Sequence, residues 1–192
     1  MPNPYPRFSV FIAASLDGFI ARADGELDWL LGATTSTDDH GYAAYMQGID
    51  TLLLGRNTYE KVLSFDPWPY AGKRVVVMSN TLDSIAPTLA AEVSLQRGTV
   101  REAAAALAAS GTSSVYVDGG KLIQSFLAEG LIDTLTITRI PMLIGNGIPL
   151  FGDAGHDIRL AHLRTTTYES GFVQSTYRVI AASQNDQAST AN

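Results

Sequence analysis

Three short polar segments, each directly after an apolar run, carry most of the chemistry in this sequence. They are residues 55–58 (Gly-Arg-Asn-Thr), 79–81 (Ser-Asn-Thr) and 118–121 (Asp-Gly-Gly-Lys). Each apolar run predicts a buried strand, and ligands of open α/β sheets bind beyond the carboxyl ends of the strands. We therefore expect the three turns to lie side by side and to form one binding site.

The residue types in these turns suit phosphate. Gly119 and Gly120 permit backbone angles closed to other residues and leave bare N–H groups at the start of a helix, whose dipole favours an anion. Arg56 can hold a phosphate with two parallel hydrogen bonds, Thr58 offers a hydroxyl, and Lys121 can add charge. An ordinary tight turn would also use the glycines. Together, however, the three turns favour a ligand with phosphates at both ends of an adenosine, NADP rather than NAD.

Strands and helices alternate along most of the chain, and two strands follow at the end. The helix over 98–111 has the clearest limits, because Thr99 and Glu102 can form a capping box and Gly111 is a natural stop. This order predicts an α/β fold with a largely parallel sheet and a C-terminal antiparallel hairpin. The expected strands are 8–15, 19–21, 50–55, 73–79, 113–117, 133–140, 158–168 and 172–180. The other expected helices are 42–49, 56–65 and 121–130. Residues 22–37 are interpreted as a long loop with a helical turn, and residues 141–151 as a loop.

Composition excludes several classes of protein. The formal charge is −6 and no cluster of Lys and Arg marks a nucleic-acid surface. Cysteine is absent, and the three histidines lack metal-ligand spacing, so no metal site is expected. No apolar run is long enough for a membrane span or a signal peptide, which predicts a soluble cytoplasmic protein. We expect one domain over residues 1–182 and a disordered tail over 183–192.

Four segments, in order, resemble the signatures of the dihydrofolate reductase-like superfamily. They are AASLDGFIA (13–21), DTLLLGRNTYE (50–60), VYVDGGKLIQSFL (115–127) and GLIDTLTITRIPMLIGNGIPLF (130–151). The resemblance is strongest to the reductase domain of bacterial riboflavin biosynthesis and its stand-alone relatives. It implies a three-layer α/β/α fold with a mixed, mostly parallel sheet of about eight strands. It also implies hydride transfer from NADPH to a pteridine- or pyrimidine-like ring, and a homodimer.

The resemblance also implies a set of cofactor-binding residues. Those matching the phosphate-binding residues lie in the three turns, and those matching the nicotinamide site lie near the N-terminus. They are Gly55, Arg56 and Thr58 for the phosphates, Ser79 and Asn80 for the adenosine 2′-phosphate, Gly119, Gly120, Lys121 and Leu122 for the pyrophosphate, Ala13, Ala14 and Ile20 against the nicotinamide, and Trp29 beside the cofactor.

Two aspartates are the candidates for contact with the substrate. Asp118 matches an acid that touches the substrate in the riboflavin-type reductases, and it is the stronger candidate. Asp39 falls near the carboxylate that binds the pterin in dihydrofolate reductases, although a helix cap is the simpler interpretation and the one we favour. Asp17 is expected to form a turn, and Asp28 could also face the pocket.

Two functions remain open from the sequence. The first is an NADPH-dependent reductase acting on a dihydrofolate-like or a phosphoribosylated diaminopyrimidine substrate. A phosphoribosyl group would call for basic residues near the pocket, and few are evident beyond Arg22 and Arg139. The second is a protein that binds NADP or a pterin without turnover.

Overall fold

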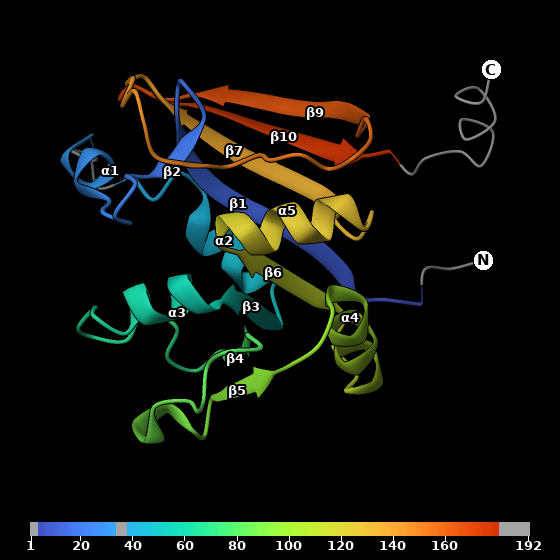
Figure 1. Cartoon of the computed structure of the whole chain (residues 1–192). Helices are drawn as coiled ribbons and strands as arrows, with labels where there is room; N and C mark the ends of the chain where they lie inside the picture. The colour runs from blue at the N-terminus through green and yellow to red at the C-terminus, as the bar shows by residue number, and fades with distance from the viewer. Residues whose placement is uncertain (1–3, 34–37, 181–192) are drawn as a thin grey trace, which may run out of the picture.

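The computed structural model describes residues 4–33 and 38–180. An eight-stranded sheet runs through it in the order β5-β4-β3-β6-β1-β7-β10-β9 (Figure 1). The strands from β5 to β7 are parallel, and β10 and β9 join them as an antiparallel pair. The expected mixed α/β sheet with a C-terminal antiparallel hairpin is therefore confirmed. The sheet strands are β1 (Arg7–Ser15), β3 (Thr51–Gly55), β4 (Arg74–Met78), β5 (Val93–Gln96), β6 (Ser114–Asp118), β7 (Thr134–Ile140), β9 (Leu160–Thr167) and β10 (Val173–Val179).

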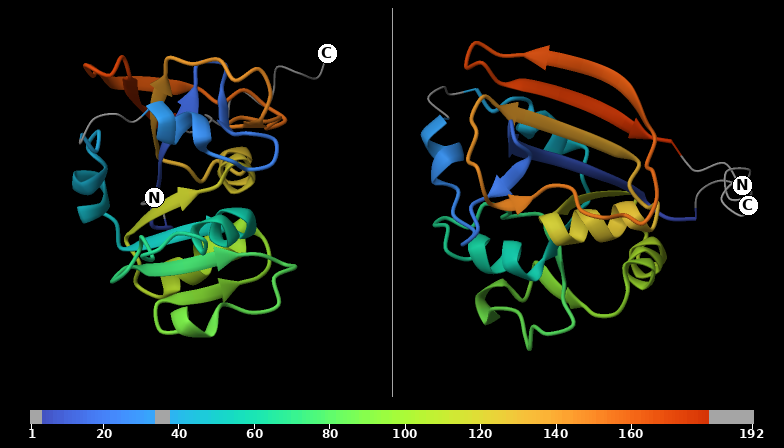
Figure 2. Two further views of the ribbon diagram at one scale, coloured as in Figure 1. Left: turned by 90° about the vertical axis from the view of Figure 1, so that its left-hand side faces the viewer. Right: turned by 45° about the horizontal axis from the view of Figure 1, so that its top comes forward.

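Each face of the sheet has its own core, because successive side chains of a strand point to opposite faces. Leu53 of β3 packs with α4 (Val100–Ala109) and α5 (Gly120–Ala128). Its neighbours Leu52 and Leu54 pack in a second cluster with α2 (Tyr42–Gln47) and α3 (Arg56–Val62). Figure 1 shows α5 in front of the sheet and α2 behind it, and the left panel of Figure 2 shows the two on opposite sides.

The capping box that the sequence predicts for α4 is present. The Thr99 hydroxyl accepts a hydrogen bond from Glu102 N at 3.2 Å, and the Glu102 carboxylate accepts one from Thr99 N at 2.7 Å. The two backbone donors are thereby satisfied, which limits the helix at its first turn.

The structure differs from the sequence prediction in three places. The segment 141–151, expected as a loop, contributes β8 (Ile148–Pro149), which pairs with β2 (Phe19–Ala21) in a second small sheet. Two-residue strands are too short to show an alternating pattern. The segment between β4 and α4 contains a 3₁₀ turn (Pro87–Leu89) and β5, and neither was expected. The strand β5 has no alternating pattern of buried residues, because only Val93 in it is buried. The third difference is one of length: α1 (Asp28–Ala33) is a six-residue helix where a loop with a single helical turn was expected. Residues 34–37 of that loop and the expected tail lie outside the described residues.

The core under α5 yields a test of this arrangement. Phe126 is fully buried, and its ring centroid lies 5.0 Å from that of Phe8 of β1 in a tilted arrangement. Phe126→Ala should therefore lower the free energy of unfolding by about 3–5 kcal/mol. Phe151→Ala is the matched control, because that side chain is 49% exposed. Urea denaturation followed by circular dichroism measures both. Equal losses in the two variants would contradict the packing described for α5.

Candidate active site

The three turns predicted to share a site do meet, at the carboxyl ends of β3, β4 and β6. Their strands are parallel neighbours, with Leu54 opposite Asp118 and Gly55 opposite Met78. A Cβ atom on Gly119 would lie 2.5 Å from the Thr58 hydroxyl, so the β6 and β3 turns are in contact. Arg56 donates to the Thr81 hydroxyl at 3.1 Å and joins the β3 turn to the β4 turn.

The two glycines of the β6 turn have a packing role that the sequence did not reveal. Gly119 has φ 109°, a conformation that favours glycine, and Gly120 is buried. A Cβ atom on Gly120 would lie 2.9 Å from Ile20 Cδ1 and 3.3 Å from Pro149 O. The space at both positions is therefore taken by the chain itself, and the glycines allow three segments to pack together. A valine at Gly120 would disturb this packing.

The backbone N–H groups at the start of α5 are suited to binding an anion. The first hydrogen bond within the helix runs from Ile123 N to Gly119 O at 2.9 Å. The N–H groups of Gly120, Lys121 and Leu122 come before it and have no acceptor within the helix. The positive end of the helix dipole lies there as well. The start of α5 lies against the start of α3, because a Cβ atom on Gly55 would lie 3.7 Å from Leu122 Cβ.

The β4 turn is held by its own polar side chains. The Ser79 hydroxyl accepts hydrogen bonds from the N–H groups of Thr81 and Leu82, at 3.2 and 3.0 Å. Asn80 exchanges two hydrogen bonds with Gly98, of 2.7 and 3.3 Å. Ser79 and Asn80 therefore shape this turn.

One cation beside the β4 turn was missed by the sequence interpretation. Arg97 follows β5 and donates to Asn80 O at 3.1 Å and Leu82 O at 2.8 Å. Arg56 lies on the other side of the turn, paired with Glu60 at 2.7 Å, and both arginines are exposed. Arg97 was missed because β5 was missed. A signal was present, because Arg97 and Gly98 follow a short strand in the same way as polar turn residues follow β3 and β6.

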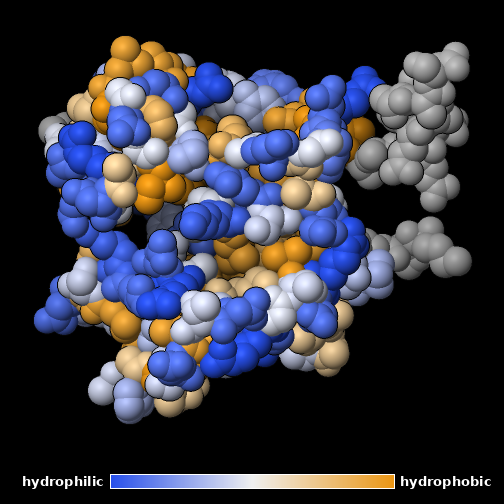
Figure 3. Space-filling view, viewed as in Figure 1, coloured by the Kyte–Doolittle hydropathy of each residue, from blue (hydrophilic) through white to orange (hydrophobic). Residues whose placement is uncertain are grey.

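A cavity of about 220 Å³ lies on the α2 face of the sheet, against β1 and β7. Its lining contains no residue of the three turns. Figure 3 shows the opposite, α5 side of the molecule, where the surface is hollowed between α1 and α3. The walls of the cavity are mostly aromatic and aliphatic, with three polar side chains among them, which is the usual makeup of a site for a planar ring. The lining residues are Phe11, Ala13, Leu30, Asp39, His40, Tyr42, Thr138, Ile140 and Phe172.

The residues expected around the nicotinamide do not all lie on the same face of the sheet. Ala13 lines the cavity, whereas Ala14 is buried in the core on the opposite face, under α5. Ile20 lies against Gly120 and so connects the small sheet to the β6 turn. Trp29 is 3% exposed and packs behind the cavity wall on Phe172. Its indole N–H is buried and has no hydrogen-bond partner among the described residues.

Asp39 does two things at once. Its Oδ1 accepts from Gly41 N at 2.9 Å and its Oδ2 from Ala43 N at 2.7 Å, which is the capping role favoured by the sequence. The same residue lines the cavity. The hydrogen bonds, that from Ala43 first, lower the pKa of Asp39. It therefore stays ionised at neutral pH and is a poor proton donor.

Asp118 is the acid whose pKa is raised furthest, although part of the residue is still exposed. It ends β6 and accepts a hydrogen bond from Gly119 N, and burial raises its pKa to about 6. Its charge is felt by four tyrosines: Tyr42, Tyr45, Tyr70 and Tyr116. Because Tyr42 also lines the cavity, the carboxyl group lies within electrostatic reach of the cavity wall. Asp118 can thus hold and release a proton near neutral pH.

The two remaining aspartates are engaged elsewhere. Asp17 accepts from the Ser15 hydroxyl at 2.6 Å and from Gly145 N at 2.8 Å, as a turn residue does. Asp28 is exposed and forms an ion pair with Arg22 at 2.6 Å. Neither lines the cavity.

His40 is a feature of the cavity wall that no sequence pattern indicated. Its ring stacks on Phe172 at 4.9 Å and meets Tyr168 edge-on, and its φ is 54°. Its carbonyl oxygen accepts from the Gln174 amide at 3.0 Å. The buried Nε2 has no partner among the described residues. A lone histidine carries no spacing signal, so only its surroundings could reveal it.

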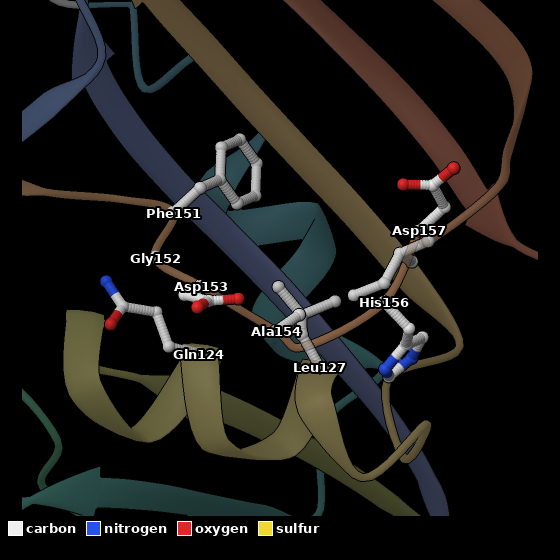
Figure 4. A pocket seen from close by; sticks show the side chains of 9 residues that line it. Gln124, Leu127, Phe151, Gly152, Asp153, Ala154, His156 and Asp157 are labelled. Carbon is white, nitrogen blue, oxygen red and sulfur yellow. The ribbon is translucent and has the colours of Figure 1, made fainter.

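A second hollow, of about 350 Å³, lies between α5 and the loop after β8 (Figure 4). Gln124 spans from the helix to that loop, donating to Pro149 O at 3.0 Å. The loop side chains that line it, such as Phe151, Asp153 and His156, are exposed. With no convergence of buried polar groups, this hollow is a surface groove and not the candidate site.

Neither a metal centre nor a membrane span emerges from residues 4–33 and 38–180. No group of three or more His, Asp or Glu side chains there is arranged to hold a metal ion. No helix in the same ranges has the length and apolar character needed to cross a bilayer.

Comparison with known proteins places the chain in a family. A protein of Shewanella sp. PV-4, assigned provisionally to riboflavin biosynthesis, is 41% identical with a TM-score of 0.86 over 91% of this chain and 99% of its own. The uncharacterized protein YwjB of Bacillus subtilis (strain 168) is 37% identical over 79% of this chain and 86% of its own. The dihydrofolate reductase of Enterococcus faecalis, 18% identical, shares the fold with a TM-score of 0.65 over 91% of this chain and 98% of its own. Residues 6–174 match the RibD C-terminal domain, and the chain therefore belongs to the RibD C-terminal domain family.

Proposed function

We propose that this chain is an NADPH-dependent reductase that transfers a hydride to a pteridine- or pyrimidine-type ring. The observation that carries the proposal is the meeting of three phosphate-suited turns at the carboxyl ends of β3, β4 and β6, in a sheet that also carries an aromatic cavity on its α2 face. Membership of the RibD C-terminal domain family supports it. The second candidate, a protein that binds NADP or a pterin without turnover, has the same geometry but gives Asp118 no task.

The residues present fit a dinucleotide with an extra phosphate. The N–H groups of Gly120, Lys121 and Leu122 suit a pyrophosphate, and Arg56 and Arg97 flank the β4 turn where a 2′-phosphate would bind. The unpaired indole N–H of Trp29 fits a polar group near the cavity. The structural neighbour from Enterococcus faecalis is a complex with NADP(H), which also supports this assignment.

The chemistry needs one hydride and one proton. NADPH, when bound, supplies the hydride from C4 of its nicotinamide, and reduction of a C=N bond to CH–NH takes up a proton as well. The aromatic walls of the cavity orient the ring and exclude water. The raised pKa of Asp118 lets that side chain hold the proton, while the ionised Asp39 accepts hydrogen bonds from ring N–H groups.

Relatives narrow the substrate only in part. The riboflavin biosynthesis protein RibD of Corynebacterium ammoniagenes is 29% identical over 84% of this chain, which spans 48% of that protein. The His-x-Glu and paired-cysteine pattern of a zinc deaminase is missing from this sequence, so a coupled deamination step is not proposed. A homodimer and a cytoplasmic location stay predictions.

The direct test of the proposed function is turnover. The purified chain should oxidise NADPH, seen as loss of the reduced-nicotinamide absorbance, with a diaminopyrimidine riboside or with dihydrofolate. Asp118→Asn should lower kcat by about 100-fold, because a positioned proton donor contributes that much or more. Tight NADPH binding with no oxidation of any such substrate would instead favour the non-catalytic binding protein.

Cofactor selectivity tests the two arginines. Arg56→Ala and Arg97→Ala should each weaken NADPH binding about tenfold, because each removes a charge-assisted hydrogen-bond donor to the 2′-phosphate. NADH, which lacks that phosphate, should lose much less. The control is Arg101→Ala, an exposed arginine of α4 that pairs with Glu129. Calorimetric titration gives the affinities of the parent chain and the three variants for both cofactors, and an equal loss for NADPH and NADH would remove the 2′-phosphate assignment.

The environment of Asp118 predicts a pH dependence of stability. Its folded pKa of about 6 exceeds the ordinary 3.8, so between these values the folded state holds the extra proton and stability falls as pH rises. Asp118→Asn removes this loss, and the variant should gain about 2 kcal/mol relative to the parent chain between pH 4 and pH 7. Urea denaturation at both pH values measures the gain, with the exposed Asp157→Asn as control. Parallel curves for the parent and Asp118→Asn would show that the carboxyl group is not desolvated.

A further inference from the structure

The charges of the residues that line the cavity limit which substrates it can bind, and this inference rests on the proposed reductase function. We propose that the ring cavity takes a heterocycle whose substituents carry no phosphate ester. None of the residues that line it is Lys or Arg. Its polar members are Asp39, His40 and Thr138, and at about 220 Å³ it suits a ring with small substituents.

The segment of residues 23–55, which contributes several of the residues that line the cavity, is negatively charged. No Lys or Arg occurs between Arg22 and Arg56, and this holds for every residue of that stretch of sequence. The stretch supplies α1, α2 and the cavity-lining residues Leu30 and Tyr42. Its acids are Asp24, Glu26, Asp28, Asp38, Asp39 and Asp50.

The start of α2 is closed to a phosphate. A helix N-terminus binds anions through its free N–H groups. Here the N–H groups of Gly41 and Ala43 already donate to the Asp39 carboxylate, and Tyr42 N donates to Asp39 O at 3.0 Å. A phosphate that bound here would have to break one of these hydrogen bonds, and it would then lie beside the like charge of the Asp39 carboxylate.

The nearest sequence candidates for a cation are occupied or face away. Arg22 is paired with Asp28 at 2.6 Å, so its charge is already matched. Thr138 and Ile140 both line the cavity, and the alternation of β7 therefore directs Arg139 to the other face of the sheet.

Arg164 of β9 acts electrostatically on Tyr168, which does not line the cavity but packs against His40, which does. It is exposed and bonds to the Thr176 hydroxyl at 3.4 Å. The ring of Tyr168 meets His40 edge-on at 4.6 Å, so Tyr168 and His40 stand between this arginine and the cavity. A phosphate bound in the cavity would therefore face the Asp39 carboxylate without a guanidinium partner.

The test compares one substrate with and without its phosphate. The probes are a diaminopyrimidine riboside and its 5′-phosphate, assayed by NADPH oxidation at low ionic strength, where charge effects are largest. We expect kcat/KM to be at least tenfold higher for the riboside. Equal values, or a preference for the phosphate, would overturn the proposal. If neither compound is reduced, the proposed function fails, and calorimetric binding of the two probes in the presence of NADP⁺ decides the selectivity by the same tenfold criterion.

Three variants, one of them a control, test whether the missing cation causes the selectivity. Leu30→Arg places a cation in the cavity wall and should raise kcat/KM for the 5′-phosphate relative to the riboside at least fivefold. Leu31→Arg is the matched control, because Leu31 is 66% exposed and does not line the cavity. Arg164→Gln should leave the ratio of the two substrates unchanged. A loss confined to the phosphorylated substrate in Arg164→Gln would show that this arginine holds the phosphate, and would overturn the proposal.

Discussion

The close contact of the β3 and β6 turns is the constraint on which the site depends. Gly119 lies so near to Thr58 that no side chain fits between them, and its backbone conformation is one that glycine adopts at least cost. This contact brings the starts of α3 and α5 to the same edge. Two helix dipoles and their free N–H groups then favour negative charge in one place. The packing role of Gly119 and the proposed phosphate site are therefore two consequences of one arrangement.

Charge is divided between the two ends of the site. Exposed arginines flank the β4 turn, where the proposed cofactor phosphates bind, whereas the ring cavity has an ionised aspartate and no cation in its lining. Between them lies Asp118, whose burial raises its pKa and whose charge acts on the neighbouring Tyr116. A dinucleotide with several phosphates and an uncharged ring would each meet the matching environment. This division supports a reductase with one highly charged and one nearly neutral ligand.

Sequence patterns predicted the elements with long, regular apolar runs and clear limits. The runs before Gly55 and Asp118 were enough to place their turns at one edge, and the capping box at Thr99 fixed the start of α4. Shorter elements could not be predicted: β8 has two residues, and only Val93 of β5 is buried. The loss of β5 also hid Arg97. Contacts between distant segments, such as those of Gly120 with Ile20 and Pro149, leave no local trace in a sequence.

Hydrogen exchange of the backbone with and without NADPH tests most directly the claim that three turns form one dinucleotide site. The account predicts that NADPH slows exchange together in residues 55–58, 79–82 and 119–122, while the groove between α5 and the loop after β8 is unaffected. Protection of one turn alone, or of the loop around Phe151 and His156 in place of the turns, would contradict it.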